Sequence, residues 1–334
     1  MIPNQWYAVL FSKEVKPCAV TSAIRLNLHL AFFRAANGVL GCVEDRCSHR
    51  GAALTKGKVK GNCLQCPFHG LEFLADGRCR FVPANGKASM EDLSRFHIKC
   101  YLVREAHGMI YLWYGDDDPN LSVPLPFFDE YLDESYACSA FSDKWNSHYS
   151  RSIENQLDVV HLPFVHYNTI GRGNKTLVNG PAVEFSNGVL RTSASNERDD
   201  GQIPKKPEEC SIGDRVFLCF RFPNVWMNRI APKYKLVIFF APVDEENTVL
   251  YIQVYSKLSR WRPLNKLIAS ASRLMAYIIE RQDHRVVITQ QPKASSYNSE
   301  EKLLVGDRPI VLYRKIREEL KQAACEQAKD RKEP

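Results

Sequence analysis

Two short clusters of cysteine and histidine most constrain what this chain can fold into. The first is Cys47–Gly51, which reads CSHRG, and the second is Cys66–Gly70, which reads CPFHG. Each stretch supplies one thiolate and one imidazole, so the two together can hold a metal centre with mixed sulfur and nitrogen ligands. The fold must therefore bring the two stretches together, and the candidate ligands are Cys47, His49, Cys66 and His69.

Two kinds of metal centre use this set of ligands. In a [2Fe–2S] cluster with two cysteines on one iron and two histidines on the other, the neutral imidazoles raise the reduction potential above that of an all-cysteine cluster. A structural zinc ion takes the same atoms. Common zinc motifs keep the two cysteines together and the two histidines together. Each stretch here carries one of each, so the spacing favours the iron–sulfur cluster.

The length and composition fit a globular protein with room for two domains. The chain has 334 residues, of which 45% are hydrophobic and 25% are charged. No window holds the ~20 apolar residues of a membrane span, and the first residues lack the basic and apolar regions of a secretory signal. Eleven cysteines, an odd number, fit reduced thiols and metal ligands in the cytoplasm better than disulfides.

The formal net charge of +7 is modest and dispersed along the chain. It lacks the clustered basic stripe and interleaved aromatics of a nucleic-acid binder. The basic residues therefore indicate a solvated surface or, more specifically, a docking face for an acidic redox partner. We expect neither nucleic acid nor membrane as a partner.

Short strands dominate the first part of the chain. β-branched and aromatic runs alternate there with turns rich in Gly, Asn and Asp, which predicts an all-β domain over residues 1–115. The two cysteine–histidine stretches lie in loops of this domain, where free backbone N–H groups can hydrogen-bond cluster sulfurs. Residues 116–135 contain Pro119, Pro124 and Pro126 among acidic residues, and we interpret them as a connector.

The second domain, residues 136–334, mixes helices with antiparallel strands. A helix is predicted from about Tyr149 to His161, and strand-like runs follow at residues 216–222, 234–240 and 248–255. A long helix then begins at Pro263 and a last amphipathic helix covers about residues 308–328. The fold class is therefore α+β, with an all-β domain followed by a domain of helices on an antiparallel sheet.

One face of the long helix is apolar, because its apolar residues recur every three or four positions. We expect this face to pack on the sheet, and its residues are Leu264, Leu267, Ile268, Ala271, Leu274, Met275, Ile278 and Ile279. Asp283 lies four residues beyond Ile279 and eight beyond Met275, so it falls on the same face. A charge there is costly unless it is paired or metal-bound. The alternative is an Asp at the helix end that meets a neighbouring arginine in solvent.

The second candidate metal site begins at Asp158, His161 and His166. Asp158 and His161 are three residues apart, so one helix places them side by side. His161 and His166 would diverge on a continuous helix, but Pro163 disfavours helical geometry at the residue before it and can let His166 fold back. Two imidazoles and one carboxylate form the ligand set of a non-haem Fe(II) site. Asp283 is the predicted carboxylate, because Asp158 is better placed to accept an imidazole N–H.

Further candidates rest on pattern alone. Asn155, just ahead of Asp158, either orients the site or lies on the helix surface. Large apolar residues of the predicted sheet and long helix are candidates for a substrate pocket, with ordinary core as the alternative for each. They are Phe220, Phe222, Trp226, Met227, Phe239, Tyr255 and Met275.

With both stretches in view, the chain resembles the Rieske non-haem iron oxygenases, specifically their catalytic α subunits. The resemblance covers the Cys47/His49/Cys66/His69 motif, the pattern Asn155-x-x-Asp158-x-x-His161-x4-His166, and the pair Gln282-Asp283. The compact length is similar to the group of vanillate and dicamba O-demethylases, phenoxybenzoate oxygenases and saxitoxin-pathway hydroxylases. Rieske proteins of cytochrome complexes are a worse match, since their loops carry disulfide cysteines where this chain has Ala52 and Phe68.

The resemblance implies a Rieske domain, a helix-grip-like catalytic domain and a head-to-tail homotrimer. It also implies that Asp158 bridges a cluster histidine, His69, of one subunit to His161 of the next as an electron-transfer link. Electrons would come from NAD(P)H through a separate reductase or ferredoxin, since the chain has no flavin or nicotinamide motif of its own. The implied reaction uses O2 at Fe(II) to hydroxylate a C–H bond of a small aromatic or alkaloid-like molecule, by monooxygenation or oxidative O- or N-demethylation.

Several alternatives stay open at this point. Aromatic-ring cis-dihydroxylation uses the same ligands and differs only in how the substrate lies. A Rieske electron-transfer protein would do no oxygen chemistry. It would not need His161, His166 and Asp283, and all three are present in this chain. A zinc-stabilised binding module would contain no labile sulfide.

Overall fold

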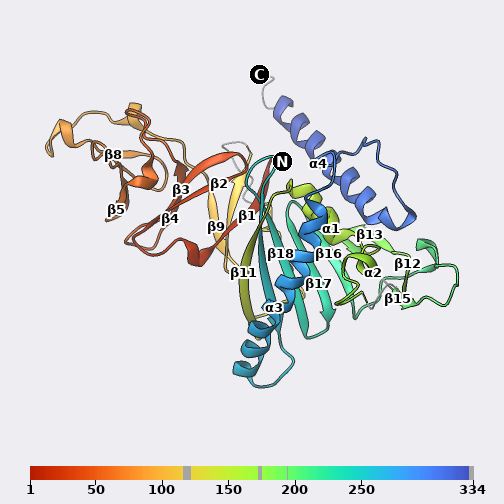
Figure 1. Cartoon of the computed structure of the whole chain (residues 1–334). Helices are drawn as coiled ribbons and strands as arrows, with labels where there is room; N and C mark the ends of the chain where they lie inside the picture. Colours follow the sequence, from red (N-terminus) through yellow and green to blue (C-terminus); the bar gives the residue numbers. More distant parts are fainter. Residues whose placement is uncertain (116–121, 172–174, 194, 331–334) are drawn as a thin grey trace. The chain divides into compact units, whose positions relative to one another are not determined.

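The computed structural model describes residues 1–115, 122–171, 175–193 and 195–330 (Figure 1). The chain divides into two compact units. The N-terminal unit is Asn4–Leu125, and the C-terminal unit combines Met1–Pro3 with Pro126–Pro334. Residues 116–121 of the predicted connector lie outside the described residues. No described helix combines the length and the apolar character that a bilayer crossing requires.

The N-terminal unit consists of small antiparallel sheets. Strands pair in the orders β1-β10-β9, β2-β3-β4 and β5-β6-β7-β8. The strands are β1 (Gln5–Phe11), β2 (Val20–Arg25), β3 (Leu28–Arg34), β4 (Leu40–Glu44), β5 (Lys58–Lys60), β6 (Cys63–Gln65), β7 (Glu72–Phe73), β8 (Cys79–Phe81), β9 (Val103–Ala106) and β10 (Met109–Tyr114).

The C-terminal unit is built on a seven-stranded antiparallel sheet of order β11-β19-β18-β17-β16-β14-β13, with a separate β12-β15 pair. Its strands are β11 (Ala137–Trp145), β12 (Thr176–Asn179), β13 (Val183–Ser186), β14 (Val189–Thr192), β15 (Ser195–Arg198), β16 (Phe217–Arg221), β17 (Val225–Ala231), β18 (Tyr234–Pro242) and β19 (Thr248–Ser256). Its helices are α1 (Tyr149–Leu157), α2 (Leu162–Val165), α3 (Arg262–Val287) and α4 (Arg308–Asp330). The predicted α+β class is confirmed.

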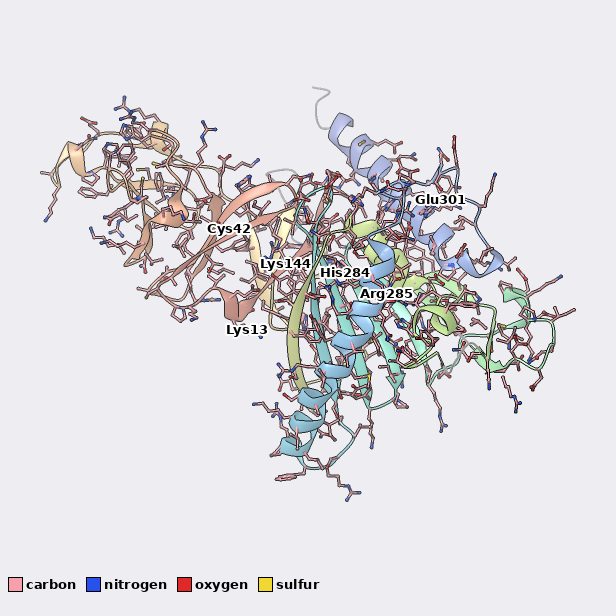
Figure 2. All side chains as sticks on the ribbon, viewed as in Figure 1. Lys13, Cys42, Lys144, His284, Arg285 and Glu301 are labelled. Carbon is pink, nitrogen blue, oxygen red and sulfur yellow. The ribbon has the colours of Figure 1, made fainter. Side chains whose placement is uncertain are left out.

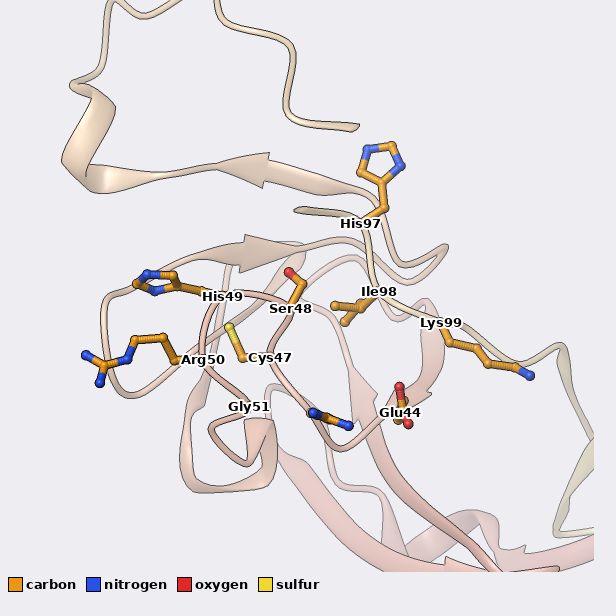
Figure 3. Close-up of a pocket in the computed structure, with 10 residues that line it drawn as sticks. Glu44, Cys47, Ser48, His49, Arg50, Gly51, His97, Ile98 and Lys99 are labelled. Atoms are coloured by element: carbon orange, nitrogen blue, oxygen red, sulfur yellow. The ribbon is translucent and has the colours of Figure 1, made fainter. Parts of the chain in front are cut away.

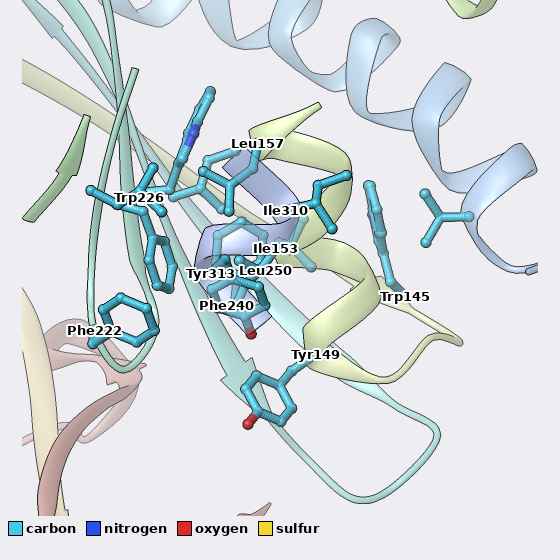
Figure 4. Close-up of a cluster of buried hydrophobic side chains, with 14 of the residues drawn as sticks. Trp145, Tyr149, Ile153, Leu157, Phe222, Trp226, Phe240, Leu250, Ile310 and Tyr313 are labelled. Carbon is cyan, nitrogen blue, oxygen red and sulfur yellow. The ribbon is translucent and has the colours of Figure 1, made fainter. Parts of the chain in front are cut away.

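The two faces of the large sheet have different coverings, because side chains alternate along each strand. Phe220, Trp226 and Ile238 are cross-strand neighbours on one face, which we call the inner face. They belong to a buried cluster that also contains side chains of α1 and α4, such as Ile153 and Tyr313 (Figure 4). The inner face is therefore the side on which the helices pack.

Helix α3 also packs on the inner face, but not through the side chains that the sequence pattern suggested. The predicted apolar face is largely exposed, with Leu274 at 68% and Met275 at 52%. Its buried residues are instead Asn265, Ala269, Glu280, Asp283, His284 and Val287. Small and polar contacts hold it to the sheet, for example Asn265 Oδ1 at 3.4 Å from Ser256 Oγ. The prediction of the packed face was wrong, because periodicity locates an apolar stripe without showing what covers it.

The predicted helix from Tyr149 to His161 also ends earlier than expected. α1 stops at Leu157, and Asp158 follows it with an extended backbone (φ −72°, ψ 131°). Pro163 then lies in the first turn of α2, where its missing N–H costs nothing. The turn between the two helices therefore comes before the proline rather than being caused by it.

A buried ionic network fixes α1 against the C-terminal part of the unit. Arg314 of α4 donates to both carboxylate oxygens of Glu154 on α1, each at 2.8 Å. Arg151 donates to the same carboxylate at 3.2 Å. Glu301, labelled in Figure 2, accepts from Arg314 at 2.7 Å and from Arg151 at 2.6 Å. The two arginines and Glu154 are buried, so removing one partner leaves a charge without compensation.

We expect Arg314→Met to lower the free energy of unfolding by about 3–5 kcal/mol, because Glu154 would stay buried without its bidentate partner. Urea titration followed by circular dichroism measures the effect. Lys315→Met is the matched control, since Lys315 is an exposed neighbour whose ion pair to Glu319 spans 3.8 Å. Equal stability of the two variants would show that the network does not hold α1 in place.

Candidate metal centres

The two cysteine–histidine stretches form loops with the same hydrogen-bond pattern. In the first, the Cys47 N–H donates to the Ala52 carbonyl and the Gly51 N–H donates back to the Cys47 carbonyl, both at 2.9 Å. The second repeats both bonds, from the Cys66 N–H to the carbonyl five residues on at 2.8 Å and from the Gly70 N–H back at 3.1 Å. The glycines have φ of +72° and +75°, which explains the residue type at these positions.

These loops hold the thiols inward and the imidazoles outward. Cys47 and Cys66 are each 2% exposed and belong to an apolar cluster, whereas His49 and His69 are exposed. The two imidazole rings lie near each other, with centroids 4.6 Å apart. Burial, together with the nearby Cys66 sulfur, raises the pKa of Cys47 to about 11 even though backbone N–H groups lower it. A thiolate there therefore needs a metal ion to stabilise it.

The spacing of these four side chains does not suit a single zinc ion. Tetrahedral zinc with bonds of about 2.0–2.3 Å requires ligand atoms roughly 3.3–3.8 Å apart. Among the described residues, the group of three or more potential ligand atoms within 4.8 Å of one another is His161, His166 and Asp283, and the two loops form no such group. Two metal ions that share the ligands do not require all four ligand atoms to lie so close together.

Basic side chains surround a hollow beside the first loop. The hollow measures about 400 Å³, and Figure 3 shows Cys47 and His49 on one side of it. Arg46, Arg50 and Lys99 line it together with one carboxylate, Glu44, so the balance of charge favours negatively charged neighbours.

His161, His166 and Asp283 converge in the C-terminal unit. His161 is the residue before α2, His166 directly follows it, and Asp283 lies on the buried side of α3. Their facing atoms form a triangle: Nε2 to Nε2 3.2 Å, and Asp283 Oδ1 to the two Nε2 atoms 3.4 and 3.0 Å. Adjacent ligands of an octahedral metal with bonds of about 2.1 Å lie roughly 3.0 Å apart, so the triangle fits one octahedral face.

The hydrogen bonds around this triangle leave its inner atoms with lone pairs. His166 Nδ1 donates to Gln282 Oε1 at 2.8 Å. His161 Nδ1 lies 3.5 Å from Asp158 Oδ2. With both Nδ1 atoms protonated, a metal ion that takes the place of a proton at Nε2 would find the Nε2 atoms directed toward the Asp283 carboxylate. Within the part of the chain that the structure describes, Asp283 Oδ1 is also a buried atom without a hydrogen-bond partner. Such a cluster of acceptors fits a bound cation.

The pKa shifts of His161 and Asp283 also agree with a bound cation in this site. Burial alone would lower the pKa of His161, but Asp158 and Asp283 together raise it to about 9. Burial alone would raise the pKa of Asp283, but the two histidines lower it to about 2. The carboxylate is therefore charged over the ordinary pH range, and positive charge between the three groups is favoured.

Asp158 and Asn155 occupy different surroundings. Asp158 Oδ1 accepts from the backbone N–H groups of Val160 (2.6 Å) and His161 (3.3 Å), which holds the turn that carries His161. Its other oxygen faces the imidazole, and a quarter of its side chain is exposed. Asn155 is half-buried on α1, and no described residue is a hydrogen-bond partner of its Nδ2.

Sequence reasoning assigned no role to two glutamines that support the site. Gln282 accepts from His166 and also from Thr169 Oγ1 at 2.9 Å, so both donors fix its carbonyl oxygen. Gln156 Nε2 donates to Asp283 Oδ2 at 3.3 Å. Glutamine on a helix reads as a surface residue, and only the adjacency of Gln282 to Asp283 gave any signal.

The structure separates the candidate pocket residues into three groups. Phe220, Phe222 and Trp226 belong to the cluster on the inner face, the side of α1 and α3. Three others project from the opposite face, where Phe127 stacks on Phe239 with ring centroids 6.1 Å apart; these are Met227, Phe239 and Tyr255. Met275 lies on the exposed side of α3. Of these candidates, the first group alone lies on the inner face of the sheet, the side of the His161/His166/Asp283 triangle.

Two family models match the chain in succession. The Rieske [2Fe-2S] domain matches residues 5–102, which include both cysteine–histidine loops. The vanillate O-demethylase oxygenase C-terminal domain matches residues 145–323, which include the His161/His166/Asp283 triangle. The second match alone spans more than half of the chain.

Curated relatives match about half of the chain. Chlorophyllide a oxygenase of Oryza sativa subsp. japonica is 29% identical over 52% of this chain and 30% of its own length. Cholesterol 7-desaturase nvd of Xenopus laevis is 34% identical over 49% of this chain and 36% of its own length. Dicamba O-demethylase, oxygenase component, of Stenotrophomonas maltophilia is 30% identical over 49% of this chain and 48% of its own length. The chain thus spans less than half the length of each of these relatives.

Solved structures share the fold over almost the whole chain. NdmA of Pseudomonas putida CBB5 superposes with a TM-score of 0.76 at 22% identity, covering 97% of this chain and 92% of that one. Dicamba monooxygenase gives a TM-score of 0.73 at 18% identity, covering 97% and 99%.

An iron–sulfur domain followed by a helix-and-sheet domain with a histidine–carboxylate triangle defines the class of Rieske-type oxygenase subunits. The chain belongs to this family, with a C-terminal domain of the vanillate O-demethylase oxygenase type. The predicted resemblance is thereby confirmed, as are the two predicted cofactors, a Rieske [2Fe–2S] cluster and a mononuclear iron.

We expect Gln282→Leu to weaken Fe(II) binding by about 10–100-fold, because His166 loses the acceptor that fixes its tautomer. Titration of chelator-treated protein with Fe(II) measures the effect, with labile sulfide showing that the cluster is retained. Asp283→Ala removes a ligand atom and should therefore abolish binding of the mononuclear iron. Gln290→Leu, at an exposed glutamine near the end of the same helix, is the control. Unchanged affinity in Gln282→Leu would contradict the role of this hydrogen bond.

Proposed function

We propose that the chain is the oxygenase component of a Rieske system that hydroxylates a C–H bond of a small organic molecule. The observation that carries this proposal is the triangle of His161, His166 and Asp283. Three such ligands would occupy one face of an octahedral metal and leave its other positions for further ligands. An electron-transfer protein has no use for this triangle, so that alternative is disfavoured.

We assign the site residues as follows. Cys47, Cys66, His49 and His69 would hold the cluster, and His161, His166 and Asp283 would hold the iron. When bound, the cluster supplies single electrons and the iron supplies the capacity to activate O2. Gln282 and Gln156 keep the ligand side chains oriented. Asp158 holds the His161 turn through its Oδ1 and faces the imidazole with Oδ2.

The substrate class is proposed from the inner face of the sheet. Phe220, Phe222 and Trp226 make this face apolar and aromatic, which suits a small aromatic or alkaloid-like molecule. Relatives named as O-demethylase, monooxygenase and desaturase favour hydroxylation or demethylation of such molecules. Ring cis-dihydroxylation remains the second candidate, because it requires the same ligands.

A separate reductase or ferredoxin is the proposed electron donor. The exposed imidazoles of His49 and His69 place the cluster ligands at the surface, and Arg50 and Lys99 lie beside them at the basic hollow. This charge favours docking of an acidic partner and predicts faster association at low salt. The eleven free cysteines support a reducing compartment such as the cytoplasm.

Self-association, proposed to give a homotrimer, is supported by the exposed apolar side of α3. Leu274, Met275 and Ile278 lie there, and Phe164 and Tyr167 are exposed on and just after the neighbouring α2. Such a patch beside a site marks an interaction surface. We propose that a neighbouring chain docks here and brings its His69 to the exposed carboxylate of Asp158.

Turnover with labelled oxygen tests the function. We expect dithionite-reduced protein, mixed with ¹⁸O2 and a panel of aromatic methyl ethers, N-methyl compounds and polycycles, to give an alcohol that carries one ¹⁸O atom or to release formaldehyde. Asp283→Ala should give none of these products, because it lacks a ligand to the iron. Incorporation of two ¹⁸O atoms would favour dihydroxylation. Absence of both ¹⁸O incorporation and formaldehyde release, or equal yields from Asp283→Ala, would overturn the proposal.

We expect Leu274→Glu to lower the sedimenting mass of the protein, because a charge would be buried in the proposed contact between chains. Sedimentation velocity measures the assembly. Ile203→Glu, at a 90% exposed residue of the loop after β15, should leave the mass unchanged. A monomeric wild-type protein would contradict the assembly.

A further inference from the structure

One buried donor on the inner face of the sheet has nothing to donate to. Trp226 is 3% exposed, and its Nε1 lies out of solvent without a hydrogen-bond partner among the described residues. An indole N–H can only donate, and leaving it unpaired in the interior costs about 1–3 kcal/mol. Its neighbours are apolar: Phe220 and Ile238 flank it across the strands, and Leu157 belongs to the same cluster (Figure 4).

Other tryptophans show what is unusual about this position. Trp145, equally buried in the same cluster, donates its N–H to Asp143 Oδ2 at 3.2 Å. Trp6 also lacks a partner for its N–H, but it lies in the N-terminal unit. Trp226 combines an unpaired donor with a place on the face that carries α1 and α3, the helices that adjoin and hold the iron ligands.

Burial on the inner face decreases to one side of Trp226. Two residues further along β17, and therefore on the same face about 6.6 Å away, is Asn228, whose cross-strand neighbours are Leu218 and Leu236. These three are partly buried, whereas the row with Phe220 and Trp226 is fully buried. A ligand that reaches the indole N–H would therefore approach it from the side of these partly buried residues.

The charge of this face restricts the acceptor that fits. None of the six positions 218, 220, 226, 228, 236 and 238 carries a charged side chain. A carboxylate buried there would lack a cation and would be strongly disfavoured. A neutral carbonyl oxygen satisfies the indole N–H without that cost.

We propose that the indole N–H of Trp226 donates to a neutral carbonyl oxygen of the substrate. This rests on the function proposed above and restricts its substrate class to apolar, uncharged molecules with a ketone, amide or lactone group. The indole N–H of Trp226 acts in selecting and orienting the substrate. It leaves the metal ligands untouched.

Binding of a matched pair of probes tests the proposal without turnover. 1-Indanone and indane share one ring skeleton and differ by the carbonyl, and isothermal titration of the iron- and cluster-loaded full chain gives both affinities. We expect wild-type protein to prefer the ketone about tenfold. Trp226→Phe, which keeps an aromatic ring but removes the N–H, should lose this preference while binding indane within about threefold of wild type. Trp261→Phe, at a 64% exposed tryptophan, should keep the preference for the ketone.

The outcomes separate the two proposals. A ketone preference that survives in Trp226→Phe, or its absence from the wild-type protein, overturns the role of the indole. Failure to bind either probe overturns the substrate class. Loss of ketone preference in Trp226→Phe supports the role of the indole even if the ¹⁸O experiment fails, because binding does not depend on oxygen chemistry.

Discussion

Repulsion between lone pairs is the constraint around which the C-terminal unit is arranged. Two imidazole Nε2 atoms and a carboxylate oxygen face one another within 3.0–3.4 Å, and a cation relieves the repulsion that this arrangement creates. The arrangement requires donors to be directed outward, which Gln282 ensures for His166. It also requires α3 to present Asp283 inward, which explains why polar residues rather than leucines face the sheet.

The local motifs could be predicted from sequence because their geometry is local. Cys47 and His49 lie in one short loop, and a glycine at positive φ closes it, so spacing alone carries the information. His161 and His166 are likewise five residues apart, and the expected fold-back occurs, although α1 ends at Leu157 and Pro163 starts the next helix.

What could not be predicted depends on contacts between distant segments. The apolar residues of α3 predicted a helix correctly but predicted the wrong side of that helix as the packed one. Asn265 on the packed side makes a close contact with Ser256 that no periodicity reveals. Asp283 was correctly expected to be buried, but its burial comes with Glu280 and His284 rather than with Met275. The face on which Met227 or Phe239 projects depends on strand parity, which is visible only once the sheet is assembled.

The ionic network between α1 and α4 has a thermodynamic consequence for the metal site. Arg314 is bonded to Glu154, and the backbone carbonyl of Glu154 accepts the N–H of Asp158 at the start of the turn that carries His161. Any ligand that binds this turn in its native form stabilises the contacts that hold it there. Occupancy of the iron site and docking of the last helix are therefore linked equilibria, so that iron protects α4 from opening and an undocked α4 weakens the hold on iron.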